Sequence, residues 1–539
     1  MRHLLERIGG FIPSLVALTL PVTVLPNASD SYILPRASIV IAGACLGVGL
    51  AFLGPRRTGL GALRWPLVAA AGAALLAFAF SVSWALSTAG SYTRYESLPM
   101  RVAYIGLAVS AVWLLRTERQ RELVGAAFVL GITVAAFKAW LQWFGHAPFR
   151  PDGDLGNANL LAALIVMAVP IAIDRGRRGT YLTGAWATAI VILLAGLVVT
   201  TSRSGALGLV AGCVAWLMLS VPARARLPAG AISGAALLGA VSFVLFSPLR
   251  ALNDDPPELR LNLWADGLKM IAARPLTGWG EDTTGLAFGQ FLSRDYAGLV
   301  TFDRVHSGVL EIAATQGILG LAALAWVLVV LARQGWRGRL GPGVPGLAGA
   351  LVGYSVWVFF NFDWAPATGA FWLLAGTLWS ASLPRSPGEV APARSARAGG
   401  GGWIWQPALA VVLALATIPL AVFPVLADVW YVHGRADLAV RVDPLQAQYH
   451  WALGQGLVAR GDLAGGVAEL QRAADLGETE PALYVELGDR EAQLGRRDEA
   501  RRAYERALQV DPFYTPAKQR LTALGTTSRS VLKKGDLGH

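Results

Sequence analysis

Long apolar runs alternate with short polar stretches along most of this chain of 539 residues. A helix needs about 20 mostly apolar residues to cross a bilayer, and thirteen runs come close to or exceed that length. They cover residues 11–26, 37–54, 66–87, 99–115, 122–144, 158–173, 180–200, 205–221, 228–246, 306–331, 345–362, 367–383 and 405–427. The pattern predicts an all-α polytopic membrane protein with about 12–14 transmembrane helices.

Arginines in the loops predict the orientation of these spans. Every second loop is rich in arginine, beginning with Arg2 and Arg7 before the first span. The intervening short loops hold only Arg36, Arg94, Arg150 and Arg203. Because basic residues favour the cytoplasmic side, we expect a cytoplasmic N-terminus. The long segment 247–305 and the chain after residue 427 then lie on the outer side.

The composition agrees with a membrane protein. Hydrophobic residues make up 54% of the chain and the mean hydropathy is +0.49. Charged residues make up 15%, against roughly 25% in soluble domains. These values exclude a disordered chain, a coiled coil and an ordinary soluble enzyme. The net charge of +11 arises in the hydrophobic part, where it follows the loop pattern, so we expect no nucleic-acid partner.

The chain after residue 427 carries a repeat of 34 residues. Leu453–Gly454 recurs as Leu487–Gly488, and residues 481–512 match the tetratricopeptide pattern of small and large residues. We therefore expect a transmembrane domain over residues 1–427 and a helical-repeat domain over residues 428–539. Two interpretations of the repeats stay open: a scaffold only, or a groove for a peptide or protein partner.

The outer segment 247–305 is the one outer loop long enough to build a site. Within it, residues 259–273 show helical spacing of apolar residues and predict an amphipathic helix at the membrane surface, in contact with lipids. The acidic pairs Asp254–Asp255 and Glu281–Asp282 resemble metal ligands, although such pairs in loops are commonly solvated. We expect no metal and no cofactor.

His306 lies where the outer segment meets a long span. Its ordinary pKa suits proton transfer near neutral pH, so it is a candidate general base for a lipid-borne substrate. The alternative is a capping histidine at the membrane interface.

Arg203 lies in Thr200–Gly205 (TTSRSG), a tight outer link between two spans. A guanidinium pairs well with phosphate, but an arginine here could also extend to lipid head groups.

The order of these motifs resembles the O-antigen ligase and polymerase superfamily of bacterial envelope glycosyltransferases. The TTSRSG link is followed by Arg260-x3-Trp264, then by RPLTGWG at 274–280, and finally by His306, Glu311 and QGILG at 316–320. The resemblance covers roughly residues 150–330, and members with tetratricopeptide repeats after the last span are known.

The resemblance implies an inverting, metal-independent transfer of a glycan from undecaprenyl pyrophosphate to an acceptor hydroxyl. The acceptor would be a glycolipid, a glycan or a protein. The reaction would take place on the periplasmic face of the bacterial inner membrane, with the C-terminal repeats on the same side.

The resemblance also assigns residues. His306 corresponds to the family's proposed base or acceptor-orienting group, and Arg203 and Arg260 correspond to the two arginines thought to hold the pyrophosphate. Arg274 and Arg304 are weaker candidates for the same contact. The residue after the family's histidine is often Asn, whereas here it is Ser307.

Four functions remain open. A ligase, a polymerase and a protein O-oligosaccharyltransferase would share the donor and the chemistry. A polysaccharide flippase is disfavoured, because the sequence shows neither inverted repeats nor charges at mid-membrane.

Overall fold

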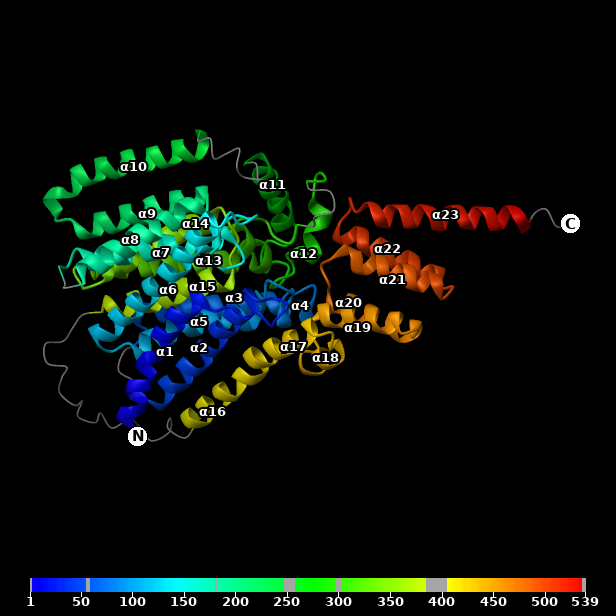
Figure 1. Cartoon of the computed structure of the whole chain (residues 1–539), viewed down its shortest axis with the longest axis horizontal. Coiled ribbons are helices and arrows are strands. Elements are labelled where there is room, and N and C mark those ends of the chain that lie inside the picture. Colours follow the sequence, from blue (N-terminus) through cyan, green and yellow to red (C-terminus); the bar gives the residue numbers. More distant parts are fainter. Residues whose placement is uncertain are drawn as a thin grey trace. The chain divides into compact units, whose positions relative to one another are not determined.

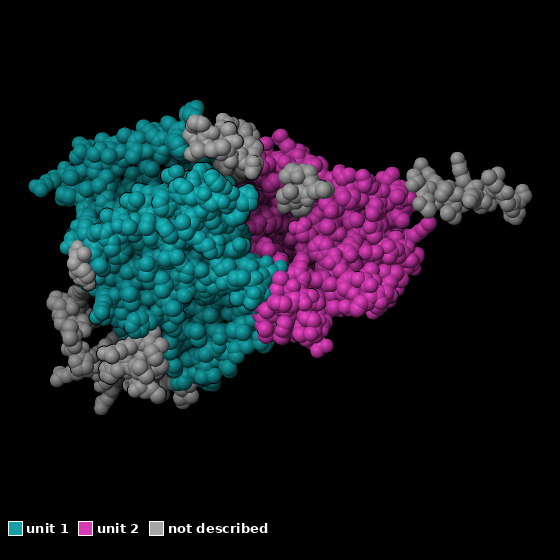
Figure 2. All heavy atoms as spheres, viewed as in Figure 1, with its two compact units in different colours: residues 1–72, 99–256, 322–425 teal, residues 73–98, 257–321, 426–539 magenta. Residues whose placement is uncertain are grey.

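The computed structural model describes residues 2–54, 59–179, 182–246, 257–296, 302–383 and 405–535. Throughout these ranges the regular elements are helices, and no strand occurs (Figure 1). The chain forms two compact units (Figure 2). Unit 1 comprises residues 1–72, 99–256 and 322–425, and unit 2 comprises residues 73–98, 257–321 and 426–539.

Unit 1 holds most of the apolar helices. Its helices are α1 (Arg2–Val22), α2 (Ile33–Leu53), η1 (Gly61–Leu63), α5 (Leu98–Leu114), α6 (Glu118–Phe144), α7 (Ala158–Gly176), α8 (Thr183–Val199), α9 (Arg203–Ser220), η2 (Ala223–Ala225), α10 (Arg226–Phe246), α14 (Val344–Phe359), α15 (Ala365–Ala381), α16 (Trp405–Thr417) and the π-helical turn Ile418–Val422. The first residue of α5, Leu98, belongs to unit 2, and three further helices are divided between the units: α3 (Arg64–Ala79), α13 (Gly308–Arg337) and α17 (Phe423–Val432).

The described helices confirm a multi-pass membrane protein. Eight of them are long and apolar enough to cross a bilayer, and several shorter apolar helices accompany them. Large apolar side chains on α8 and α10 are exposed, among them Val191, Val198, Ile232 and Leu238. Such exposure is expected of helices that face lipid tails rather than water.

The apolar run at 66–87 does not form one helix, contrary to the sequence prediction. Helix α3 ends at Ala79, and the short helix α4 (Trp84–Ala89) follows. Ser81 Oγ donates to the carbonyl of Ser83, and Ser83 Oγ accepts from the backbone N–H of Leu86 at the start of α4. Serine side chains that bond nearby backbone groups compete with a continuous helix, which explains the break.

Helices α9 and α14 approach each other through glycines. A Cβ on Gly208 would lie 2.8 Å from the carbonyl oxygen of Gly353, and one on Gly212 would lie 2.7 Å from that of Gly349. The spacing of four residues on both helices is that of membrane helices in close backbone contact. The start of α9, which carries Arg203, therefore rests on a tightly packed helix pair.

Unit 2 combines parts of the outer segment with the C-terminal repeats. The outer segment supplies α11 (Pro257–Ala273), α12 (Thr284–Ala287) and η4 (Phe288–Phe291). The repeats are formed by α18 (Ala436–Val442), α19 (Ala447–Ala459), α20 (Leu463–Leu476), α21 (Pro481–Gln493), α22 (Arg497–Val510) and α23 (Thr515–Gly535). The helix predicted at 259–273 and the helix pair predicted at 481–512 are both present.

The repeats pack directly on the outer segment. Leu286 of α12 packs against the apolar core of the repeats, and a Cβ on Gly289 would lie 1.9 Å from the carbonyl oxygen of Val510. Ser83 Oγ donates to the carbonyl of Leu476, and Gln446 Nε2 donates to the carbonyl of Gly90, each at 3.3 Å. The repeat helices are therefore part of the same compact body as the outer segment.

Candidate functional site

His306 lies in a loop whose geometry selects one tautomer of its neutral ring. Its Nδ1 is 3.0 Å from the carbonyl oxygen of Arg304. Because a carbonyl only accepts, Nδ1 carries the hydrogen in this contact, and Nε2 is then the basic nitrogen of the neutral ring. The ring of Phe302 meets the imidazole edge to face, with 5.6 Å between ring centroids. The ring is thus oriented from two sides, as a general base requires.

The backbone of His306 is also unusual. Its φ is 59°, in the left-handed region that non-glycine residues rarely adopt. Trp264 Nε1 of α11 donates to its carbonyl at 3.3 Å. A strained residue persists only where its surroundings enforce the conformation, and such residues concentrate at functional sites.

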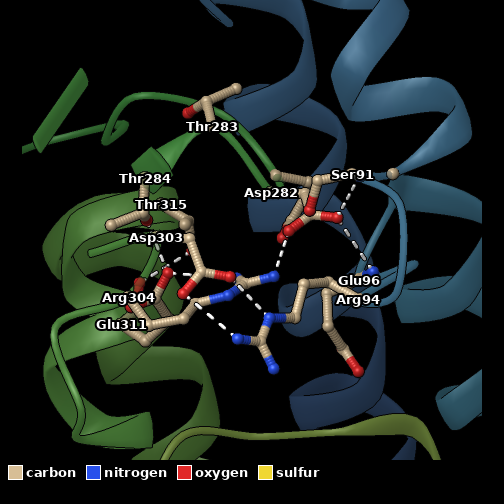
Figure 3. A network of polar contacts seen from close by, with 12 residues as sticks. Ser91, Arg94, Glu96, Asp282, Thr283, Thr284, Asp303, Arg304, Glu311 and Thr315 are labelled. Carbon is tan, nitrogen blue, oxygen red and sulfur yellow. Dashed lines mark hydrogen bonds and ion pairs between the residues drawn. The ribbon is translucent and has the colours of Figure 1, made fainter. Parts of the chain in front are cut away.

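Arg304, two residues before His306 in the chain, belongs to a network of charged groups (Figure 3). The Arg304 guanidinium pairs with Asp282 and, at 3.1 Å, with Glu311 in the first turn of α13. Glu311 also accepts from the backbone N–H of Val305 at 2.9 Å and from the hydroxyl of Thr284 at 2.5 Å. The buried carboxylate of Glu311 therefore contacts both Arg304 and Val305, the two residues before His306.

The network continues into the segment before α5. Asp282 accepts from the backbone N–H groups of Ser91 and Glu96 at 2.7 and 3.1 Å. Arg94 pairs with Asp303 through two hydrogen bonds, of 2.5 and 3.2 Å. Burial acts to raise the pKa of Asp303, but the positive charges of Arg94 and Arg304 outweigh it and hold the pKa at about 2. Asp303 is therefore ionised at every physiological pH.

The RPLTGWG motif docks into a break in α13. Gly317 interrupts the helix with a φ of 67° and a ψ of −166°. The carbonyls of Ala314 and Thr315 accept from the backbone N–H groups of Trp279 and Gly280, at 2.9 and 3.0 Å. The N–H of Ile318 donates to the carbonyl of Pro275 at 2.8 Å. The RPLTGWG and QGILG motifs are thus two halves of one structural joint, which the sequence alone did not reveal.

The predicted pyrophosphate ligands of the outer segment differ in their surroundings. Arg260 is half-buried on α11, one turn before Trp264. Arg274 follows α11, donates to the carbonyl of Phe80 at 3.2 Å and lies over the ring of Trp279, 4.4 Å from its centroid. Arg304 is fully buried between two carboxylates. Its geometry fits a role in holding the loop, and its predicted contact with phosphate stays a prediction.

Arg203 belongs to the other unit. It is the first residue of α9, and Ser202 caps this helix by accepting from the N–H of Gly205 at 3.2 Å. Thr201, two residues before it, has a φ of 52°. Unit 1 therefore holds Arg203 on a capped helix start after a strained link, while unit 2 holds His306, Arg260, Arg274 and Arg304.

The structure explains the serine at position 307 and the acidic pair Glu281–Asp282, both noted in the sequence. Ser307 immediately precedes α13 and is buried; serine and asparagine are about equally good at this capping position. The acidic pair Glu281–Asp282 is also buried, contrary to the solvated loop considered from the sequence. Asp282 pairs with Arg304. The pair Asp254–Asp255 lies outside the described residues.

The sequence analysis did not single out Arg94 and Asp303, whose ion pair belongs to the network that contains Arg304. The sequence places Arg94 and Asp303 more than 200 residues apart, and nothing in either local pattern links them. The sequence did offer one indication that Arg94 has a specific role, because Arg94 and Arg150 are among the few arginines of the predicted outer loops. Within the ranges that the structure describes, no group of three His, Cys, Asp or Glu side chains could hold a metal ion.

Comparison with known families gives two matches. Residues 188–325 match the family model described as O-antigen ligase, and residues 481–514 match the tetratricopeptide repeat model. No curated protein matches the chain. The predicted resemblance is confirmed, and the first match contains all five predicted site residues. It indicates a glycosyltransferase of the ligase or polymerase type.

Proposed function

We propose that the protein transfers a glycan from undecaprenyl pyrophosphate to an acceptor hydroxyl, in the manner of an O-antigen ligase. The observation that carries the proposal is the Nδ1 contact of His306 with the Arg304 carbonyl, in a loop fixed by buried ion pairs. The contact makes Nε2 the basic nitrogen. The match of residues 188–325 to the O-antigen ligase family supports the same reaction.

The proposed reaction needs one base and fixed positive charge. Nε2 of His306 takes the proton of the acceptor hydroxyl as its oxygen attacks the anomeric carbon. The bond from that carbon to the pyrophosphate oxygen breaks on the opposite face, so the configuration inverts. The pyrophosphate leaves with the bonding electrons, and the guanidiniums of Arg203 and Arg260 offset its charge.

Transfer by the purified full-length protein in lipid nanodiscs tests this proposal. The donor is an undecaprenyl-pyrophosphate-linked glycan, offered with candidate acceptors. A positioned general base contributes about 100- to 10,000-fold to the rate, so His306→Ala should reduce kcat by that order. His433→Ala is a matched control, since His433 makes the same kind of Nδ1 contact, to the carbonyl of Val429, but is exposed. Full transfer by His306→Ala and Arg203→Ala would refute the proposal.

The acceptor decides between the related functions. A lipid-core conjugate would identify a ligase, a lengthened lipid-linked chain a polymerase, and a glycoprotein a protein O-oligosaccharyltransferase. One observation favours a protein acceptor as the second candidate: the repeats pack on the segment that carries His306. A Cβ on Gly285 would touch both Thr479 of the repeats, at 3.1 Å, and Asp303, at 3.2 Å. Mass spectrometry of the product distinguishes the three outcomes.

We also propose that the protein lies in the bacterial inner membrane, with the outer segment and the repeats in the periplasm. The alternation of arginine-rich loops supports this orientation.

A further inference from the structure

Arg150, which lies between α6 and α7 in unit 1, joins three separate segments of that unit. Its Nη2 donates to the carbonyl of Thr200 at 2.6 Å and to Oδ1 of Asn159 at 3.3 Å. Its Nε is 3.2 Å from both the carbonyl of Thr200 and the hydroxyl of Thr201. One guanidinium thus connects the loop before α7, the first turn of α7 and the link between α8 and α9.

The link between α8 and α9 needs such support. Thr201 is β-branched and has a φ of 52°, a left-handed conformation that is strained in a non-glycine residue. Immediately after it, Ser202 caps α9 and Arg203 begins the helix. A shift of the link would move the backbone of Arg203 and, with it, the guanidinium group.

The other side of the helix start is held independently. Asn361 Nδ2 donates to the hydroxyl of Ser204 at 2.9 Å and to the carbonyl of Trp357 in α14 at 2.8 Å. Together with the close contact of α9 and α14, this bond fixes the first turn of α9. The link before that turn is fixed by Arg150.

We propose that Arg150 is a positioning residue, which holds the Thr200–Ser202 link so that Arg203 meets the pyrophosphate of the donor. The inference rests on the proposed function, and specifically on the role of Arg203. The planar fork of Arg150 bonds the Thr200 carbonyl and two side chains at once. A lysine would supply the charge but not this fixed arrangement of donors.

The test is a double-mutant cycle on the full-length protein in nanodiscs. The variants are Arg150→Gln, Arg150→Lys, Arg203→Ala and the double variant Arg150→Gln/Arg203→Ala. The readouts are kcat and KM for the undecaprenyl-pyrophosphate-linked glycan, and the inhibition constant of undecaprenyl pyrophosphate. Two sites that act through each other give non-additive effects in such a cycle.

If Arg150 acts through Arg203, Arg150→Gln should reduce kcat/KM about 10- to 100-fold, because a misplaced binding group costs that order. Arg150→Lys should lose nearly as much, and the inhibition constant should rise in both variants. In the Arg203→Ala background, Arg150→Gln should have little further effect.

Additive losses would overturn the inference, since Arg150 would then act independently of Arg203, by direct contact with the donor or through general stability. Wild-type kinetics of Arg150→Gln would overturn it as well. Full transfer by Arg203→Ala is a different result, because it refutes the role of Arg203 in the proposed function itself. An unchanged elution profile of each variant on size exclusion excludes misfolding as the cause of a loss.

Discussion

Glu311 holds the loop before α13 in place through several hydrogen bonds. It is fully buried, and its carboxylate receives hydrogen bonds from Arg304, Val305 and Thr284. Its place in the first turn of α13 also suits a negative charge, because the N-terminal end of a helix is electropositive. A single carboxylate therefore joins α12, the loop of His306 and the start of a membrane helix.

We expect Glu311→Gln to damage both stability and transfer. The change leaves the buried Arg304 with one carboxylate partner, and breaking a buried ion pair costs about 3 kcal/mol or more. Because His306 would be misplaced rather than removed, kcat should fall more than the donor KM rises. Thermal unfolding in detergent and steady-state kinetics measure the two effects. The control Glu505→Gln changes an exposed glutamate of α22 and should alter neither; wild-type stability of Glu311→Gln would contradict the assigned role of the network.

At the scale of elements, the joint between the RPLTGWG segment and α13 is the most constrained part of unit 2. Gly278 has a φ of 68°, and a Cβ on it would lie 2.4 Å from the backbone of Thr315. A break in a membrane helix frees backbone groups that must be satisfied by other parts of the protein. Here the outer segment satisfies them.

Gly278→Ala should therefore separate the segment from α13. We expect a loss of about 3 kcal/mol or more in unfolding free energy, since both the backbone conformation and the space exclude a side chain. Gly239→Ala in α10 is the control, because nothing lies within 4 Å of the added Cβ. Unfolding midpoints of the two variants give the comparison, and equal midpoints would show that the joint does not stabilise the protein.

The turn between α20 and α21 should make the stability of the repeats depend on pH. Burial raises the pKa of Glu478 to about 7, although its carboxylate accepts from the N–H groups of Thr479 and Glu480. Between the ordinary glutamate pKa and about 7, the folded state binds more protons than the unfolded state. Stability contributed by this group is therefore present at low pH and is lost as the pH rises to about 7, by up to about 3 kcal/mol.

Hydrogen exchange of the full-length protein measures this dependence. Amides of α20 and α21 should be better protected at pH 5.5 than at pH 8, after correction for the intrinsic exchange rates. In Glu478→Gln the amide oxygen keeps the two backbone contacts without the charge, so the difference should disappear for these helices. Equal protection of the wild type at both pH values would rule out the shifted pKa.

At the scale of the whole molecule, the parts that could be predicted from the sequence are those with a local periodic signal. Each of the thirteen apolar runs contains a helix, because hydrophobic length alone selects a helix in a membrane. The repeat at 481–512 was visible because small and large residues recur at fixed spacing. The helix at 259–273 was visible for the same reason.

The remaining features depend on contacts between distant segments. Asp266 of α11 looks like a solvent-facing residue in the sequence, yet it is buried and accepts from the N–H of Ser293 and the hydroxyl of Tyr296. Leu261 and Leu268 of the same helix are exposed, and its predicted contact with a membrane surface stays a prediction. The spacing of apolar residues identified the helix. It did not show that a polar side chain, that of Asp266, lies on the buried face of this helix.

The predicted orientation can be checked by cysteine labelling. In a protein whose Cys45 and Cys213 are replaced by alanine, single cysteines are introduced at the exposed positions His146, Arg224 and Arg502. The positive-inside pattern predicts that a membrane-impermeant maleimide labels positions 146 and 502 in cells with a permeabilised outer membrane. Position 224 should react only after lysis. Labelling of position 224 in unlysed cells would contradict the predicted orientation and indicate the opposite one.

The packing of the repeats on the outer segment has a consequence for biosynthesis. Leu286 and the backbone at Gly289 are covered by helices that leave the ribosome more than 150 residues later. The compact unit that contains His306 cannot be completed until these repeat helices have been made. A chain cut short before α22 would leave this surface uncovered, and proteases and chaperones recognise such unfinished proteins. The protein therefore cannot present a finished site before α22 has been synthesised.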